Sequence, residues 1–303
     1  MTKKTLFLSQ SAHLSLKKNQ LLVYLKKKKE QNQYPIEDLA IIVLEHQEIT
    51  LTQQLLAHFG AQNVAVVFCD PSHLPNSMLR SFDAYYLSSA RFRQQITASH
   101  PLRKQLWQKT IKHKIRQQAQ LLTMIGSSGS DLLYHMAKNV RSGDSTHLEA
   151  QAARNYWTLL LGADFYRSRI GPSPNHLLNY GYAIVRAATA RALVGNGLNN
   201  ALGIHHHNQY NAFCLADDMM EPYRPFVDAL VYDMEKQMPL DGTITSSEKA
   251  QLLGVLTMDC LWEGQCTTVG NAIQRTASSL ATCFEEKTPH TLSFATHYVL
   301  SEL

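Results

Sequence analysis

The sequence has no long apolar run, and none of its apolar stretches approaches the roughly 18 residues of a membrane-spanning helix. Its first residues, MTKKTLFLSQSAHLSLKK, are partly basic but contain an apolar run of only three residues, too short for the core of a secretory signal peptide. We therefore expect a cytoplasmic protein without membrane association.

Cysteine is also scarce, and its spacing follows no known framework. The five cysteines are Cys69, Cys214, Cys260, Cys266 and Cys283. An odd, scattered set without any C-x-x-C pair argues against both a disulfide framework and a structural zinc site. We expect reduced thiols that are mostly buried.

Charge is modest, with 17% charged residues, a formal net charge of +5 and a pI near 8.9. This balance permits an anionic partner such as nucleic acid but does not require one. The 45% of apolar residues is ordinary for a globular protein. At about 150 residues per domain, a chain of 303 residues predicts two domains.

Two patterns divide the chain. The first 75 residues hold short apolar runs rich in β-branched residues, TLFLS, QLLVYL, LAIIVLE and VAVVF, and one helix-like segment ending at Gly60. The prolines of CDPSHLPNS (69–77) predict a linker. Helical patterns follow near 102–125, 146–163, 175–195, 213–238, 246–259 and 268–285.

The predicted fold class is therefore α+β, with a small β-rich N-terminal domain over 1–75 and a larger all-α domain over 76–303. The tail after about residue 285 shows no strong periodicity, so we expect it to be loosely held.

One predicted helix combines an apolar face with many basic residues. Its apolar positions are Leu102, Leu106, Ile111, Ile115, Ala119 and Leu122, spaced by three to five residues. The remaining positions carry Arg103, Lys104, Lys109, Lys112, Lys114 and Arg116, with no acid among them. A solvated face and a surface that binds a phosphate backbone both explain this pattern, which leaves the two readings open.

Residue types that bind hard cations occur in the helical part. Mg²⁺ and Mn²⁺ prefer carboxylate oxygens with at most an imidazole or so, and keep positions open for water and phosphate. Asp218 and Glu221 are three residues apart and would share a helix face. The triplet in LGIHHHNQ places His205 at a loop-to-helix entry, and Glu149 is an acid in an Ala-rich stretch.

Structural roles compete with metal binding at each of these positions. An acid near a helix start, such as Asp217, is favoured there by the helix dipole alone. A histidine within a triplet is usually a core or hydrogen-bonding residue. Because spacing cannot show that distant carboxylates meet, the residues alone predict no more than a divalent-metal site on a helical domain with basic flanks.

The helical part contains, in this order, the segments EAQAARNYW (149–157), PNHLLNYGYAIVRA (174–187), GLNNALGIHH (197–206) and LADDMMEPYRPFVD (215–228). In order and spacing they resemble the motifs of CRISPR-associated protein 1, the integrase that inserts new spacers. Upstream, PIEDLAIIVLE (35–45), VVFCDPSHLP (66–75) and LWQKTIKHKIRQQA (106–119) are similar to its N-terminal and linking segments. The resemblance fades only beyond about residue 285, and HHNQYNAFCLADD looks most like the version of RNA-guided single-effector (type II) systems.

The resemblance implies which residues act. The family's metal ligands, which are also its catalytic residues, fall on Glu149, His205 and Glu221. Asp218 corresponds to a further, supporting acid that either assists the metal or hydrogen-bonds a ligand. The β-rich domain is expected to serve dimerisation, and the helical domain to be catalytic.

The implied activity is a transesterification that depends on Mg²⁺ or Mn²⁺. A 3′-hydroxyl of captured spacer DNA attacks a phosphodiester at a CRISPR repeat border, and with water the same site acts as an endonuclease. The implied partners are double-stranded and branched DNA, a second copy in a homodimer, and CRISPR-associated protein 2 in a heterohexamer. Other adaptation proteins and the RNA-guided effector nuclease are further candidate partners.

Because captured spacers vary in sequence, binding is expected to depend on phosphate contacts. The candidate contacts are Arg103, Lys104, Lys112, Arg116, Arg154, Arg167, Arg169, Arg186 and Arg224, each with an internal ion pair as the competing reading. His206 and His207 are expected to serve structure or the DNA backbone.

A stand-alone metal-dependent nuclease that acts on branched DNA in repair is the alternative, and it predicts cleavage without joining. A non-enzymatic DNA-binding scaffold is a third reading. It predicts that Glu149→Ala and His205→Ala change only stability.

Overall fold

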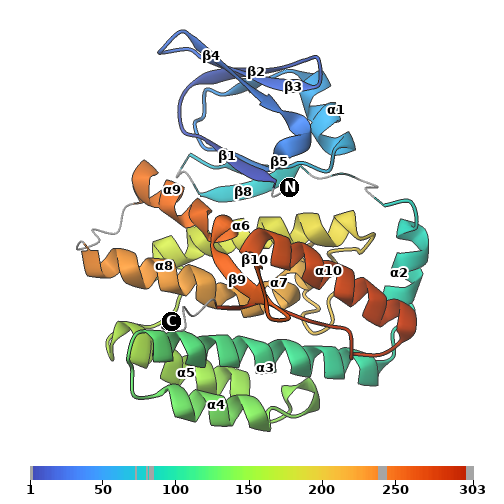
Figure 1. The fold of residues 1–303 in the computed structure, drawn as a ribbon, viewed down its shortest axis with the longest axis vertical. Coiled ribbons are helices and arrows are strands. Elements are labelled where there is room, and N and C mark those ends of the chain that lie inside the picture. Colours follow the sequence, from blue (N-terminus) through green and yellow to red (C-terminus); the bar gives the residue numbers. More distant parts are fainter. Residues whose placement is uncertain (1–2, 72–73, 80, 82–84, 238–243, 298–303) are drawn as a thin grey trace.

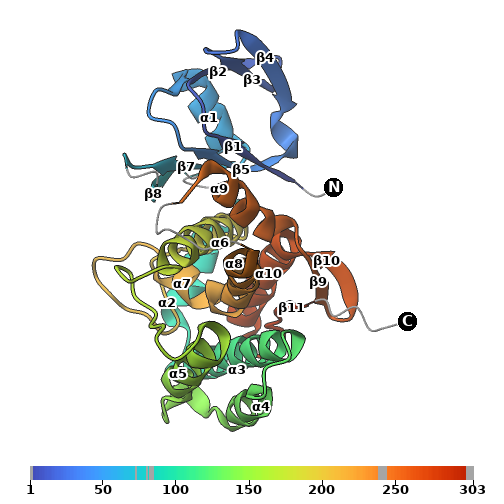
Figure 2. The same ribbon diagram turned by 90° about the vertical axis from the view of Figure 1, so that its left-hand side faces the viewer.

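The computed structural model describes residues 3–71, 74–79, 81, 85–237 and 244–297. A β-rich N-terminal part sits at one end of a larger, mainly helical part, as both views show (Figures 1 and 2). The predicted α+β class is confirmed.

In the N-terminal part, the described residues form two four-stranded sheets and one α-helix. Its elements are β1 (Lys4–Leu8), β2 (Ala12–Lys17), β3 (Gln20–Leu25), β4 (Glu30–Pro35), the 3-10 turn η1 (Ile36–Asp38), β5 (Leu39–Leu44), β6 (Thr50–Leu51), α1 (Gln53–Ala61), β7 (Ala65–Cys69) and β8 (Pro75–Leu79). One sheet has the order β1-β5-β7-β8 and the other β4-β3-β2-β6. The four predicted apolar runs coincide with β1, β3, β5 and β7.

The apolar run of β5 is continuous because both faces of its sheet are covered. Side chains alternate along a strand, so Ile42 and Leu44 face the core of the N-terminal part. Ile41 and Val43 face the opposite way and join the core of the helical part. The two parts of the chain therefore share a packed boundary.

The stretch predicted as a linker, 69–77, also contains ordered structure. Its last residues begin β8, which pairs antiparallel with β7. Pro75 can sit at the start of this strand because β8 is the last strand of its sheet, where a missing N–H breaks no central ladder.

The helical part is built around two long central helices, α3 and α6. Its helices are α2 (Ser88–Thr97), α3 (His100–Met124), α4 (Ser130–Asn139), α5 (Leu148–Leu161), α6 (Asn175–Gly195), α7 (Cys214–Met220), α8 (Arg224–Gln237), α9 (Ser246–Leu253) and α10 (Val269–Glu286), with 3-10 turns η2 (Ser142–Asp144), η3 (Glu221–Tyr223) and η4 (Gly254–Thr257). All six apolar positions predicted for the face of α3 are buried. The hydroxyl of Ser99 accepts the Leu102 N–H and so caps its start.

The prediction that the larger domain is all-α is wrong in one region. A three-stranded sheet, ordered β10-β9-β11, forms from β9 (Asp259–Trp262), β10 (Gln265–Thr268) and β11 (Thr296–His297). Glu263 and Gly264 both have positive φ and form the tight turn between β9 and β10. The helical pattern expected to 259 therefore ends earlier, at α9 and η4.

The tail is not loosely held over residues 287–297. Leu292, Phe294 and Ala295 are buried, and the Ala295 carbonyl lies 2.7 Å from Nε2 of His113 on α3. An irregular segment that ends in a two-residue strand carries no sequence period, so periodicity could not reveal this packing. Residues 298–303 lie outside the described part.

The expectation of reduced, mostly buried cysteines agrees with the structure. All five cysteines are free thiols and three of them are buried, while Cys69 is half-buried and Cys266 is exposed. Within the ranges described, no helix is both long and apolar enough to cross a membrane.

Candidate active site

A buried lysine on α3 lies at the centre of the candidate site. The Nζ atom of Lys114 is 2.7 Å from Oε1 of Glu149 and 2.6 Å from Oε2 of Glu221. The lysine side chain is only 11% exposed, which makes this pair of contacts a desolvated cluster. Two carboxylates that are distant in sequence thus meet on one cationic group.

Glu149 is positioned by the start of α5, whose N-terminus favours a negative charge. The buried carboxylate of Asp144 accepts the backbone N–H groups of Leu148 (2.9 Å) and Glu149 (3.1 Å). Asp144 thereby caps the first turn of α5 and fixes where the Glu149 side chain leaves the helix.

Glu221 lies between α7 and α8, at the first position of η3, and is 4% exposed. Burial alone would raise the pKa of Glu221, but the charges of Arg224 and Lys114 outweigh burial and hold the pKa below its usual value. Arg224 contributes through an ion pair of 2.8 Å to Oε1. The contact of Oε2 with Lys114 is a close ion pair but not an aligned hydrogen bond.

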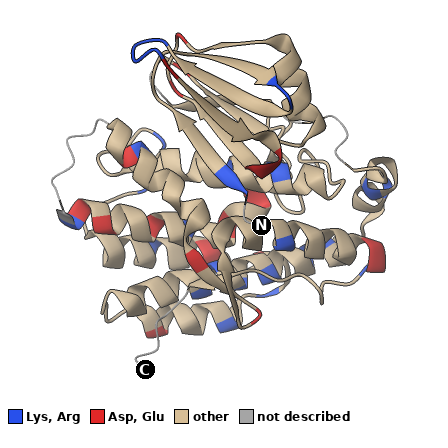
Figure 3. Cartoon of the chain, turned by 45° about the horizontal axis from the view of Figure 1, so that its top comes forward, with Lys and Arg blue, Asp and Glu red and all other residues tan. Residues whose placement is uncertain are grey.

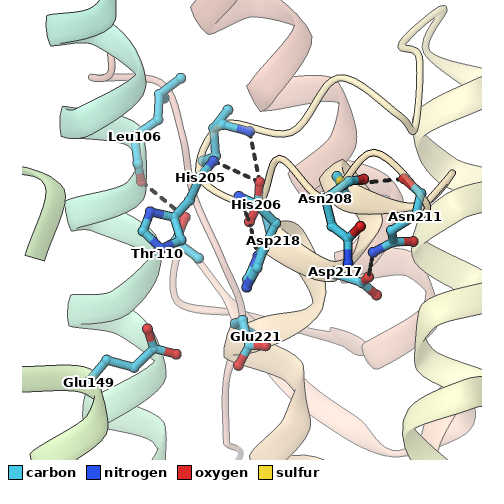
Figure 4. A network of polar contacts seen from close by, with 12 residues as sticks. Leu106, Thr110, Glu149, His205, His206, Asn208, Asn211, Asp217, Asp218 and Glu221 are labelled. Atoms are coloured by element: carbon cyan, nitrogen blue, oxygen red, sulfur yellow. Dashed lines mark hydrogen bonds and ion pairs between the residues drawn. The ribbon is translucent and has the colours of Figure 1, made fainter. Parts of the chain in front are cut away.

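Asp218 is completely buried and anchors the loop that carries His205. Its carboxylate accepts the backbone N–H groups of Ile204 (2.7 Å), His205 (3.0 Å) and His206 (3.2 Å), and it lies 2.6 Å from Nδ1 of His206 (Figure 4). These contacts use both oxygens of Asp218. Of the two roles left open for this acid, the geometry favours hydrogen bonding over contact with a metal.

The turn around Asp218 needs glycine at position 203. A Cβ atom there would lie 2.3 Å from the carbonyl oxygen of His206 and 3.0 Å from a carboxylate oxygen of Asp218. The glycine of LGIHHH therefore allows the backbone to wrap closely around the carboxylate.

His205 faces the same region from this loop, and its ring stacks on Trp107 of α3 with centroids 4.1 Å apart and an interplanar angle of 1°. Burial lowers the pKa of His205, and the charge of Asp218 offsets this only in part. At neutral pH the ring is therefore mainly neutral, which is the form that binds metals. In contrast, the hydrogen bond with Asp218 raises the pKa of His206. Within the triplet, His205 therefore faces the site, whereas His206 holds the loop through Asp218.

The structure brings two of the three expected ligands together directly. Glu149 and Glu221 share Lys114, while His205 lies in the same neighbourhood on the loop above them (Figure 4). Among the described residues, no three His, Cys, Asp or Glu side chains stand in a geometry that would hold a metal ion as they are. Lys114, which sequence reasoning assigned to the basic side of α3, takes the central position instead.

A polar and aromatic cavity of about 380 Å³ adjoins this cluster. Its lining includes Lys114, Gln118, Arg154, Trp157, Phe165, Tyr166, Arg167, Tyr182, Arg224 and Asp228. Cationic and aromatic groups together suit a nucleic-acid strand, because they pair with phosphates and stack on bases.

The nine candidate DNA contacts form two groups, those whose side chains already have a partner within the protein and those whose side chains have none among the described residues. Arg103 donates to backbone carbonyls of α2, and Arg167, Arg186 and Arg224 make hydrogen bonds or ion pairs with neighbouring side chains. Lys104, Lys112, Arg116, Arg154 and Arg169 form no side-chain hydrogen bond or ion pair with other described residues. Figure 3 shows Lys and Arg positions interspersed with Asp and Glu positions along the helices.

Asp228, on the wall of the cavity, is a buried carboxyl beside the candidate site that sequence reasoning did not single out. Both of its oxygens accept tyrosine hydroxyls, from Tyr156 at 2.8 Å and from Tyr182. Burial raises the pKa of Asp228 to about 6, although the two hydroxyls and Arg224 favour its charged form. A carboxyl two residues after the buried Phe226 on a helix carries no distinctive sequence signal.

This shift predicts a stability difference with pH. The folded pKa of about 6 lies above the unfolded value of about 3.9, so only the folded chain holds the proton between these values. The contribution of Asp228 to stability should then be greatest below about pH 4 and fall by up to about 3 kcal/mol as the pH rises from 4 to 6. Urea denaturation across this pH range measures the unfolding free energy, which should decrease with pH more steeply in the wild type than in Asp228→Asn. Equal pH slopes for the two proteins would contradict the raised pKa of Asp228.

Comparison with known proteins agrees with this architecture. The family model described as CRISPR associated protein Cas1 matches residues 6–254. The CRISPR-associated endonuclease Cas1 of Neisseria meningitidis serogroup C (strain 8013) is 35% identical over 283 residues, covering 92% of this chain and 91% of that protein. CRISPR-associated endonuclease Cas1 1 of Francisella tularensis subsp. novicida (strain U112) is 23% identical, with 87% and 90% covered.

Solved structures share the fold at low sequence identity. A casposase bound to integration product has a TM-score of 0.79 at 18% identity, covering 100% of this chain and 96% of that one. A chain of a Cas6-RT-Cas1–Cas2 complex has a TM-score of 0.77 at 18% identity, covering 98% of this chain and 36% of that longer one. A Cas1 protein from Thermotoga maritima has a TM-score of 0.76 at 16% identity, with 93% and 97% covered.

The match to the Neisseria protein is consistent with the expected type II-like version. Because the family model spans most of the chain and a curated relative aligns over nearly all of it, this chain belongs to the Cas1 family of CRISPR-associated proteins.

Proposed function

We propose that this protein is the metal-dependent integrase of CRISPR adaptation, joining 3′-hydroxyl ends of captured DNA to repeat borders by transesterification. The observation that carries the proposal is the meeting of Glu149 and Glu221 on one buried cationic group, with the mainly neutral ring of His205 facing the same region. The casposase with its integration product has the same fold, which supports strand joining as the reaction class.

The residues fit a divalent ion such as Mg²⁺ or Mn²⁺. Two carboxylates and one neutral imidazole are a suitable donor set for these cations. The two carboxylate oxygens already lie 2.6 and 2.7 Å from a positive group, so the protein gathers negative charge where a cation belongs. A bound ion would neutralise charge on the phosphodiester oxygens and polarise the nucleophile or leaving oxygen.

The chain's own groups prepare this site. Arg224 and Lys114 keep Glu221 ionised despite its burial. Asp218 holds the backbone of the histidine loop, and Trp107 fixes the plane of the His205 ring. The cavity beside the cluster offers the exposed side chains of Arg154 and Tyr166 to an incoming strand.

DNA binding is expected to rest on the basic side chains that have no internal partner. Arg154 is exposed and lines the cavity. If it contacts one phosphate, Arg154→Ala should weaken binding to all sequences alike and make the slope of log affinity against log salt shallower by about 1. Fluorescence anisotropy of a labelled duplex over a salt series measures this. Lys138→Ala, on the exposed side of α4, is the matched control, and an unchanged slope in Arg154→Ala would remove Arg154 from the contact set.

Two ends of captured DNA require two active sites, so we also propose a homodimer that assembles with CRISPR-associated protein 2 into a heterohexamer. A chain of the Cas6-RT-Cas1–Cas2 complex shares this fold, which supports the choice of partner. Light scattering of the co-purified proteins would report the stoichiometry.

A joining assay tests the proposed function. Purified protein with its partner, short duplex DNA, Mn²⁺ and a supercoiled plasmid carrying a CRISPR repeat should yield covalent strand-transfer products at the repeat borders. Cleavage of branched DNA without any joining would favour the stand-alone nuclease. Absence of both activities, with DNA binding intact, would favour the scaffold.

A further inference from the structure

Lys114 occupies the position that the proposed metal would need. Its Nζ atom lies within 2.7 Å of oxygens from both Glu149 and Glu221, so the lysine already supplies the cationic partner of these two oxygens. The chain thus carries its own cation in the centre of the candidate metal site.

The charges of this cluster are already balanced. Glu149 and Glu221 contribute two negative charges, and Lys114 and Arg224 contribute two positive ones. A divalent ion added to an unchanged cluster would leave an excess of positive charge among desolvated groups, which is costly. A bound ion and the ammonium group of Lys114 therefore exclude each other at these oxygens.

The displaced ammonium has somewhere to go. Lys114 lines the neighbouring cavity of about 380 Å³, and its flexible four-carbon stem allows the head group to swing there. Gln118, one turn further along α3, lines the same cavity and is 3% exposed. Within the described part of the chain its Oε1 atom is buried and has no hydrogen-bond partner. This oxygen is an acceptor for which the present arrangement supplies no donor.

We propose that Lys114 is an exchangeable internal cation. It is a positioning residue whose ammonium group can occupy two positions, one between the two carboxylates and one in the cavity. Without a divalent ion it holds Glu149 and Glu221 together. When the ion binds, the ammonium group withdraws into the cavity toward Oε1 of Gln118. This inference rests on the proposed function, because it assumes that Glu149 and Glu221 are metal ligands.

The exchange has two consequences that a purely structural lysine would not have. Since the ion must displace a resident positive charge, Lys114 lowers the affinity for the ion while stabilising the metal-free protein. Since the released ammonium enters the basic cavity, it becomes available to a DNA phosphate there. Lys114 would thus link metal loading to strand binding.

The test is Mn²⁺ binding by the purified full-length protein, followed through the electron paramagnetic resonance signal of free Mn²⁺. In Lys114→Met the affinity should rise by about tenfold or more, the size of a typical coupling between two sites. Without metal this variant should melt at a lower temperature than wild type, and Mn²⁺ should raise its melting temperature more. Lys114→Gln, which keeps a hydrogen-bond donor without the charge, should bind Mn²⁺ more tightly than wild type even if the methionine variant folds poorly.

Two controls separate this inference from the proposed function. Lys138→Met removes an exposed lysine of α4 and should leave Mn²⁺ affinity unchanged. Glu149→Gln should weaken binding and so identify the site being titrated. Wild-type binding that neither Lys114 variant tightens would overturn the exchange alone. No Mn²⁺ binding by wild type or any variant would overturn the metal site, and the exchange with it.

Discussion

Replacing Glu221 with glutamine should slow strand joining by about 10³-fold or more, because a metal ion typically supplies several kcal/mol of transition-state stabilisation. The change keeps the shape of the side chain but removes the negative charge that faces Lys114 and Arg224. DNA affinity should stay within about twofold, since phosphate contacts come from other side chains. Single-turnover joining rates and anisotropy measured on the same preparation give both numbers.

The control for this variant is Glu235→Gln, an exposed position on α8 outside the candidate site. It should join at the wild-type rate. Glu221→Gln with undiminished joining would show that Glu221 does not take part in the chemistry, whereas loss of both joining and DNA binding would point to a structural role.

Replacing Asp218 with alanine should cost about 3 kcal/mol or more of unfolding free energy. Three backbone N–H groups and one histidine ring would lose their shared acceptor, and each buried donor left unpaired costs about 1–3 kcal/mol. The loop would also release His205, so joining in the folded fraction should fall by about 10–100-fold, as expected for a residue that orients a ligand.

Urea unfolding measures the stability change, and joining by the folded protein measures the rest. Asp233→Ala makes the same chemical change at an exposed position on α8 and should alter neither quantity. A stable Asp218→Ala protein with normal joining would mean that the histidine loop holds its shape without this carboxylate.

Local patterns predicted the elements that local physics decides. In β5, β7 and α3, a few consecutive or regularly spaced apolar residues are enough to predict which side chains are buried. The structure contains all three elements. β2 and β4 were missed because their residues are mixed or polar, and β4 has no buried residue at all. The small C-terminal sheet was missed because β11 is only two residues long.

The candidate site depended on information that no local pattern contains. Spacing put Asp218 and Glu221 on one helix face, yet only the fold shows that one binds a loop and the other a lysine. Glu149 comes from a different helix, so its approach to Glu221 is a property of tertiary packing. The resemblance to a family grouped Glu149, His205 and Glu221, and the structure places two of them, Glu149 and Glu221, on one lysine.

Lys114 shows where a stricter reading of the sequence would have succeeded. It lies three residues after Ile111 and one before Ile115, so a helical wheel already places it at the edge of the buried face of α3. Grouping it with Lys112 and Arg116 on a face that is either solvated or phosphate-binding overlooked this position. A lysine inside an apolar stripe deserves a search for its carboxylate partners.

The most direct test of the account is a crystal structure of the protein with Mn²⁺ and branched DNA, in which anomalous scattering locates the ion. The account predicts one peak about 2.1 Å from oxygens of Glu149 and Glu221 and a nitrogen of His205, next to a phosphodiester, with Lys114 withdrawn from both carboxylates. A peak elsewhere, or carboxylates that still hold Lys114 while DNA is bound and Mn²⁺ is in excess, would contradict it.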